Sequence, residues 1–160
     1  RIMLEKIARA TVAKAARFDA QELAAEHEDY AKKVVKILRS MERKPRNEML
    51  ASVEGKDKET VARIREMMYS IDDVGTLDDR TIQKLLAEVD TDTLSKVLKN
   101  ADESIADRVL SNLSRRARAG LIEEMDLLSH VGEDERRMAE RKIVQVLIEL
   151  DQRGELTTLA

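Results

Sequence analysis

Apolar residues recur every three or four positions along most of the chain, with polar and charged residues between them. This period places the apolar side chains on one face of a helix. The clearest stripe consists of Ile82, Leu85, Leu86 and Val89. The pattern predicts helices over residues 3–17, 26–41, 45–54, 57–68, 78–89, 91–100, 102–113, 114–127 and 133–153.

The residues between these stripes fit the ends of helices. Asp57 and Asp78 stand just before apolar stripes and belong to a residue type that caps helix N-termini. Pro45 suits the first turn of a helix, because its missing N–H group is not needed there. Residues 72–77 interrupt the period with two acids and a glycine, so we expect a loop.

Composition favours helices over strands. Only 2% of the residues are aromatic, whereas strands are rich in aromatic and β-branched residues. Two segments, "RNEMLASVEGKDKETV" and "RTIQKLLAEVDTDTL", share the order of an apolar stripe, an acid and a second short helix. We therefore expect an all-α fold of stacked helix repeats of the armadillo or HEAT type, arranged as a right-handed superhelix.

Charge and residue usage argue against several function classes. The chain has a net charge of −3 and no cysteine. Its mildly basic first part holds only three aromatic residues, too few for a base-stacking surface, and its second part is acidic, so nucleic acid is not an expected partner. No metal-binding spacing, phosphate-binding glycine loop or nucleophile motif occurs. We expect no enzyme activity, no cofactor and no small-molecule substrate.

No apolar run reaches the roughly 18 residues that a membrane-spanning helix needs. The absence of cysteine is compatible with a cytoplasmic protein. Because the sequence begins with Arg1, we expect the chain to be part of a longer protein.

The segment "LSRRARAGLIEEMD", residues 113–126, reverses the usual order of charges in a helix. Its ionic residues, which we call the charged ridge, are three arginines near the start and three acids near the end: Arg115, Arg116, Arg118, Glu123, Glu124 and Asp126. Helix dipoles favour the opposite order, so each terminal charge costs about 0.3–1 kcal/mol at low salt. No acid and base in the segment are three or four residues apart, so no pair within the helix offsets this cost. Either neighbouring helices supply partners, or the charges face an external protein.

The segments around this helix resemble one protein family. "LDDRTIQKLLAEVDTDTLSKVLKNADESIADRVLSNLSRRA" resembles the C-terminal domain of the flagellar motor switch protein FliG, and the similarity continues through "KIVQVLIELDQRGEL". "ILRSMERKPRNEMLASVEGKDKETVARIREMM" is similar to the family's connection from the middle to the C-terminal domain. The resemblance implies an armadillo-like rotor component whose C-terminal domain faces the stator.

The resemblance also implies which residues contact the stator. Lys99 falls at the family's charged position after the "KVLKN" helix. Arg116 falls at the arginine of the torque helix, and Glu123 and Glu124 fall at its acidic pair. The charged ridge would then present complementary charge to a passing stator protein.

The resemblance further implies a hinge. The family's Met-Phe-Val-Phe motif reads Met68-Tyr69-Ser70-Ile71 here, with a polar residue in the third position. If these residues dock on a neighbouring helical unit, the loop containing Gly75 would let the C-terminal part rotate.

Partners, location and domain limits are implied in the same way. The partners would be a stator protein, other switch-complex proteins and further copies that associate in a ring. The location would be cytoplasmic, peripheral to the inner membrane at the flagellar basal body. Residues 1–71 would form the end of the middle domain and the connection, and residues 72–160 the C-terminal helical domain with its torque-type helix.

Departures from the family pattern keep two alternatives open. "SHVG" stands where the family has Gly-Pro-Val-Arg, and the family's Glu-His-Pro-Gln motif is absent. One alternative is a FliG-like interaction scaffold with no motor role. The other is a regulatory helical domain of the magnesium transporter type, in which Asp72, Asp73, Asp78 and Asp79 would bind Mg²⁺.

Overall fold

The computed structural model describes residues 28–159. The expected helix over residues 3–17 therefore lies outside the described residues. Residues 28–40 are helical and belong to a compact unit of residues 1–42. Residues 43–160 form a second compact unit, which we call the C-terminal unit.

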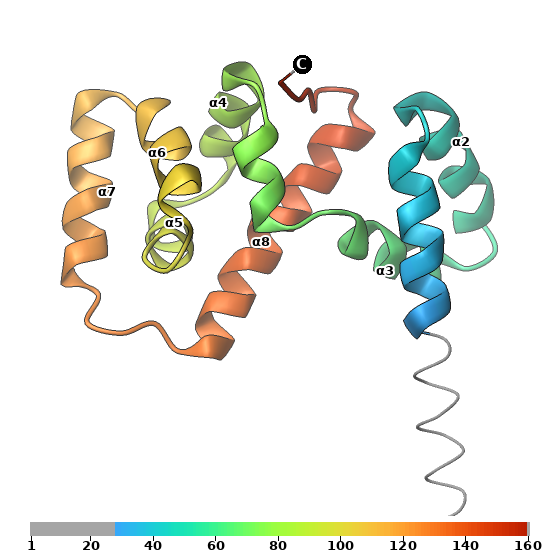
Figure 1. Cartoon of the computed structure of the whole chain (residues 1–160), viewed down its shortest axis with the longest axis horizontal. Coiled ribbons are helices and arrows are strands. Elements are labelled where there is room, and N and C mark those ends of the chain that lie inside the picture. The colour runs from blue at the N-terminus through green and yellow to red at the C-terminus, as the bar shows by residue number, and fades with distance from the viewer. Residues whose placement is uncertain (1–27, 160) are drawn as a thin grey trace, which may run out of the picture. The chain divides into compact units, whose positions relative to one another are not determined.

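The C-terminal unit consists of helices throughout, and the described residues contain no strand. The all-α expectation is confirmed, whereas the armadillo-like repeat stays a prediction. The helices, shown in Figure 1, are α2 (Arg43–Glu54), α3 (Lys58–Met68), the 3₁₀ helix η1 (Ile71–Thr76), α4 (Asp79–Glu88), α5 (Thr91–Leu98), α6 (Glu103–Ser111), α7 (Arg115–Leu127) and α8 (Glu133–Gln152).

The long helix α8 organises this unit, because it contacts α3, η1, α4 and α5. Helix α5 contacts both α8 and α7 and so connects them. Helix α2 packs on α3. Figure 1 shows α4 to α7 on one side of α8 and the pair of α2 and α3 on the other.

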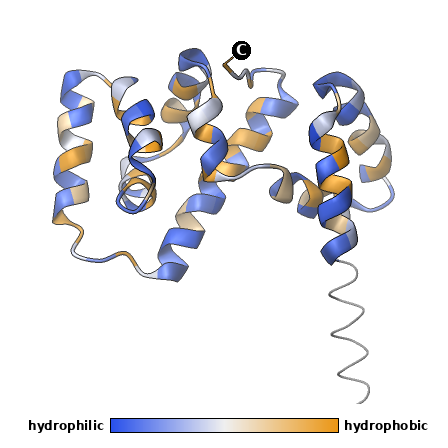
Figure 2. Cartoon of the chain, viewed as in Figure 1, coloured by the Kyte–Doolittle hydropathy of each residue, from blue (hydrophilic) through white to orange (hydrophobic). Residues whose placement is uncertain are grey.

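One hydrophobic core joins α4, α5, α6 and α8. Figure 2 shows the apolar bands that recur along these helices, as their sequence period requires. Helix α8 contributes Ile143, Leu147 and Leu150, which are almost completely buried. From α7 only Leu121 is buried in this core. Helix α7 is therefore a peripheral helix that exposes most of its surface.

The predicted caps at Asp57 and Asp78 are confirmed. The Asp57 carboxylate accepts a hydrogen bond from the backbone N–H of Thr60 at 3.0 Å. The Asp78 carboxylate accepts one from the N–H of Thr81 at 2.8 Å. Each bond satisfies one of the N–H groups that a helix start leaves free.

Residues 72–77 are not the loop that the sequence predicts. Residues 71–76 form η1, and its Val74 is completely buried. The Ser70 N–H donates to the Asp73 carboxylate at 2.7 Å and stabilises the start of this turn. A single 3₁₀ turn has no extended apolar period, so the pattern gives no signal for it.

Two smaller expectations are also corrected. The helical spacing of residues 113–128 predicts Ala117 on the same face as Leu113 and Leu121, but it is exposed because α7 touches the core only near Leu121. Helix α2 begins at Arg43, so Pro45 lies inside the first turn instead of at its start. Pro45 does not disturb the helix there, because the first turn needs no N–H group from proline.

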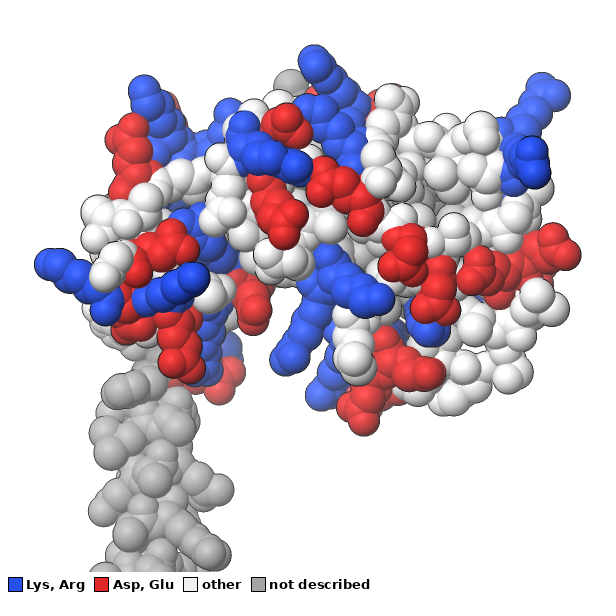
Figure 3. Space-filling view, turned by 180° about the vertical axis from the view of Figure 1, so that it is seen from behind, with Lys and Arg blue, Asp and Glu red and all other residues white. Residues whose placement is uncertain are grey.

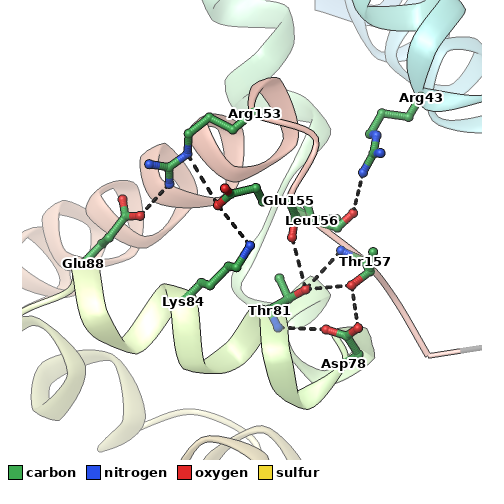
Figure 4. Close-up of polar contacts among 9 residues, drawn as sticks. All are labelled: Arg43, Asp78, Thr81, Lys84, Glu88, Arg153, Glu155, Leu156 and Thr157. Carbon is green, nitrogen blue, oxygen red and sulfur yellow. Dashed lines mark hydrogen bonds and ion pairs between the residues drawn. The ribbon is translucent and has the colours of Figure 1, made fainter.

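After α8 the chain turns back along the start of α4, as Figure 4 shows. The Thr157 hydroxyl donates to the Asp78 carboxylate at 2.5 Å, and the Thr157 N–H donates to the Thr81 hydroxyl oxygen at 3.1 Å. The Asp78 N–H donates to the Thr157 carbonyl at 3.1 Å. Residues 155–159, which we call the C-terminal tail, are thus fixed to α4.

Gly154 makes this return possible. Its φ of +72° is the only positive φ among the described residues, and glycine adopts it without a steric cost. The Glu155 N–H donates to the Leu150 carbonyl at 2.8 Å and the Gly154 N–H to the Asp151 carbonyl at 3.0 Å. This pattern is a Schellman motif, which ends α8 and reverses the chain.

The bonds around Asp78 predict a specific acid sensitivity. Hydrogen bonds from Thr157 and Thr81 lower the pKa of the Asp78 carboxyl to about 2. The unfolded chain, with a pKa of about 3.9, takes up the proton first as the pH falls. The stability that Asp78 contributes is therefore complete above about pH 4 and lost between about pH 4 and pH 2.

We expect Asp78→Asn to flatten the fall in the free energy of unfolding between pH 5 and pH 2, measured by urea denaturation. The matched control is Asp107→Asn, which changes an exposed acid of α6 that forms no side-chain hydrogen bond or ion pair with the described residues. If the free energy of unfolding fell as steeply with pH in Asp78→Asn as in the parent chain, the acid sensitivity would not come from Asp78.

Candidate functional site

The charged ridge lies on the exposed side of α7. Ser114 caps this helix, because its hydroxyl accepts a hydrogen bond from the N–H of Ala117 at 3.2 Å. All six ridge residues are exposed except Glu124, which is half-buried. The predicted order of charges is present, with no acid in the first turn and no base in the last.

Within the part of the chain that the structure describes, none of the six ridge residues forms an ion pair. The explanation that neighbouring helices supply opposite charges is therefore wrong for the described residues. No ion pair among the described residues therefore offsets the unfavourable interaction of these charges with the helix dipole.

Helical geometry orders these charges into two zones. At 100° per residue, Arg116 and Glu123 lie only about 20° apart around the axis and about 10 Å apart along it. Arg115 and Asp126 also lie about 20° apart around the axis, and about 16 Å apart along it. Figure 3, the view from behind, shows basic atoms at the top of the edge that α7 forms and acidic atoms below them. The exposed face of α7 thus presents a basic zone followed by an acidic zone.

Lys99 occupies the end of a different helix. It is the C-cap of α5, and its N–H donates to the Ser95 carbonyl at 3.0 Å. It is half-buried and forms no ion pair with a described residue. Helix α5 packs on α7, but among the described residues no side-chain hydrogen bond or ion pair joins Lys99 to the charged ridge.

Gly120 lies inside α7, where an added Cβ atom would meet nothing within 4 Å. Its φ is not positive, so alanine fits the backbone. Because alanine is a better helix former, we expect Gly120→Ala to raise the free energy of unfolding by up to about 1 kcal/mol. Urea denaturation checks this value. A loss of stability would show that the α7 backbone at this position is not helical in solution.

The expected hinge residues connect α3 to η1. Met68 is the buried last residue of α3, while Tyr69 and Ser70 are extended and half-buried. Ile71 begins η1. Gly75 lies inside η1, and a Cβ atom there would stand 3.6 Å from Ile105 Cγ1, an ordinary contact. In this conformation neither sterics nor a positive φ requires glycine at position 75.

With this geometry established, the chain can be compared with known proteins. The model of the FliG C-terminal domain family matches residues 51–157. The chain belongs to the FliG family.

Curated FliG sequences and solved FliG structures agree with this assignment. The flagellar motor switch protein FliG of Aquifex aeolicus is 30% identical over 155 residues, which are 97% of this chain and 44% of that protein. FliG of Helicobacter pylori is 31% identical over 78% of this chain and 36% of its own length. The structure of full-length Aquifex aeolicus FliG matches with a TM-score of 0.69 and 28% identity, covering 88% of this chain and 46% of that one.

The chain spans less than half the length of these curated FliG relatives. The division that we expect between residues 71 and 72 stays a prediction. By compactness alone, the FliG-like helices α2 and α3 group with α4 to α8, in the unit of residues 43–160.

This FliG domain also contains a buried polar cluster that the sequence pattern does not predict. Arg46 Nη2 of α2 lies 3.0 Å and 3.1 Å from the two carboxylate oxygens of Asp151 in α8. Asn47 Nδ2 donates to the same carboxylate at 3.2 Å, and Arg46 Nη2 donates to the Tyr69 hydroxyl oxygen at 3.5 Å. We call these four residues the Asp151 cluster. Burial, and then the charge of Asp151, raises the pKa of the Tyr69 hydroxyl.

A signal for this cluster was present in the sequence. Arg46 stands in the first turn of α2 and Asp151 near the end of α8, so each opposes its own helix dipole in the way the charged ridge does. Here the two opposed charges pair with each other. Their side chains are only 11% and 5% exposed.

Three of the four acids considered for Mg²⁺ have other bonds in this FliG domain, and the fourth, Asp72, is exposed. Asp73 and Asp78 bond the backbone at the starts of η1 and α4, and Asp79 pairs with Arg108 at 3.0 Å. Among the described residues, no group of three or more acidic or histidine side chains is placed to hold a metal ion. Over the same residues, no helix is long and apolar enough to cross a membrane.

Proposed function

We propose that the chain is the torque-bearing part of a flagellar rotor component and that α7 faces the stator. One observation carries the proposal. The charged ridge is exposed, opposes the helix dipole and has no ion pair among the described residues. A surface that costs stability and gains no internal contact fits a role outside the chain.

The membership in the FliG family supports this proposal. In the proposed role, Arg116, Glu123 and Glu124 of α7, with Lys99 of α5, contact a stator protein. Other switch-complex proteins and further copies in a ring are the remaining partners. The place of action is the cytoplasmic side of the inner membrane, at the flagellar basal body. The role is structural, with no catalysis and no cofactor.

The test exchanges the two signs in one variant, Arg116→Glu with Glu123→Lys, in the full-length protein of a motile cell. Complementary contact with the stator would be lost, so we expect swimming speed and the torque on tethered cells to fall to near zero. The exchange also places an acid at the start of α7. The free energy of unfolding of the purified chain should therefore stay unchanged or rise by up to about 1 kcal/mol.

Asp107→Lys is the matched control, because it reverses an exposed, unpaired charge on α6. It should leave motility unchanged. A motile sign-exchange variant would overturn the proposal and favour a FliG-like scaffold that meets no stator. Loss of stability in that variant would also overturn it, because the ridge would then have internal partners. A rise in melting temperature on adding Mg²⁺ would favour the magnesium transporter alternative.

A further inference from the structure

The pair of α2 and α3 is attached to α8 by more than the hinge residues. Helix α3 contacts α8 directly. The Asp151 cluster forms a second attachment, because Arg46 and Asn47 of α2 both bond Asp151 of α8. A third bond joins Arg43 of α2 to the carbonyl of Leu156 in the C-terminal tail at 2.8 Å (Figure 4).

The direct attachment of α3 to α8 is not closely packed. A cleft of about 350 Å³ separates the end of α3 and the hinge from the middle of α8. Met67, Ser70, Arg141 and Gln145 are among the residues that line it. Part of the interface between α3 and α8 is therefore open, and the walls of the cleft lack van der Waals partners there. The Asp151 cluster lies farther along α8 and attaches α2 to that helix.

The Asp151 cluster has the properties of a contact that is either fully made or fully broken. Removing one partner of a buried ion pair leaves the other charge unpaired in a poorly solvated place, which is strongly unfavourable. The cluster is also incompletely satisfied, because Arg46 Nε and Asn47 Oδ1 are buried without a hydrogen-bond partner among the described residues. Water would solvate both atoms after separation, so the separated state remains accessible.

The hinge and the cluster share one residue. Tyr69 belongs to the extended connection between α3 and η1, and its hydroxyl contacts Arg46. A rotation of α4 to α8 about residues 68–71 would carry Asp151 away from Arg46 and Asn47. The rotation therefore requires the cluster to open.

We propose that the Asp151 cluster is a latch that holds α2 and α3 docked on α8, and that the hinge turns only when this latch opens. The proposal extends the proposed function by a hinge at Met68–Ile71, the hinge that the sequence predicts from its resemblance to the FliG family. Its readout is a distance within the purified chain, so it can fail while the stator proposal stands, and the reverse also holds.

The experiment measures the distance between α3 and α6 in the full chain. Because the sequence has no cysteine, spin labels can be attached to Glu59→Cys and Asp107→Cys, which are both exposed positions. Double electron–electron resonance should give one distance in the labelled parent chain. In Asp151→Asn, a second distance should appear, with a population at least about tenfold above that in the parent.

Glu54→Gln is the matched control. Glu54 pairs with the buried Arg65 at 3.3 Å and joins α2 to α3, but this pair does not cross the hinge. The control should keep a single distance. A single unchanged distance in Asp151→Asn would overturn the proposal, and so would an equal second population in Glu54→Gln.

A second variant covers the case in which Asp151→Asn loses its helical circular dichroism. Asn47→Ala keeps the ion pair and removes only the 3.2 Å bond to Asp151. We then expect a second distance in Asn47→Ala, and a single distance would overturn the proposal.

Discussion

Replacing Leu147 with alanine is expected to lower the free energy of unfolding by about 3–5 kcal/mol. Leu147 is completely buried in the middle of α8, the helix that contacts α3, η1, α4 and α5. The substitution removes buried apolar surface and leaves a cavity that rigid neighbours on several helices cannot fill. Urea denaturation followed by circular dichroism measures the loss.

Met138→Ala is the control for Leu147→Ala, because Met138 lies in the same helix but is 67% exposed. It should change the free energy of unfolding by no more than about 0.5 kcal/mol. A loss below about 1 kcal/mol in Leu147→Ala would show that α8 is not the centre of the core in solution.

Replacing Asp151 with alanine is expected to cost about 3 kcal/mol or more, because Arg46 would remain buried without its partner. The double variant Arg46→Met with Asp151→Leu should recover most of this loss, since apolar residues of similar volume often replace a buried ion pair without penalty. Urea denaturation of the two variants and the parent gives both numbers.

The exposed pair of Glu133 and Arg137 provides the comparison for Asp151→Ala. Glu133→Ala removes a partner in the same helix, but surface pairs contribute only about 0–1 kcal/mol. If the double variant were less stable than Asp151→Ala, the ion pair would be worth more than the apolar packing that replaces it. The loss in Asp151→Ala would then not come from an unpaired arginine.

Local physics made most of the helices predictable. The apolar period and the caps at Asp57 and Asp78 define helix limits through residues close together in sequence. The reversed order of charges at residues 113–126 is likewise visible from neighbouring residues alone, so the charged ridge is predictable from the sequence. Whether a stator uses Arg116, Glu123 and Glu124 remains a prediction.

The remaining features depend on long-range contacts. Arg46 and Asp151 are 105 residues apart, so the sequence showed two charges opposed to their dipoles but not that they meet. The turn at η1 forms because Val74 is buried, which no local period reveals. Ala117 was misplaced because an alanine fits an apolar face and an exposed face equally well.

The path of the C-terminal tail depends on having glycine at a single position, residue 154. Any other residue type would bear the steric cost of a left-handed backbone, about 1–2 kcal/mol. A different backbone conformation at this position would also move Thr157 away from Asp78. The exposed residue Gln152, at the end of α8, has a helical backbone and can change without such a penalty. As sequences derived from this one diverge, we therefore expect Gly154 to be retained.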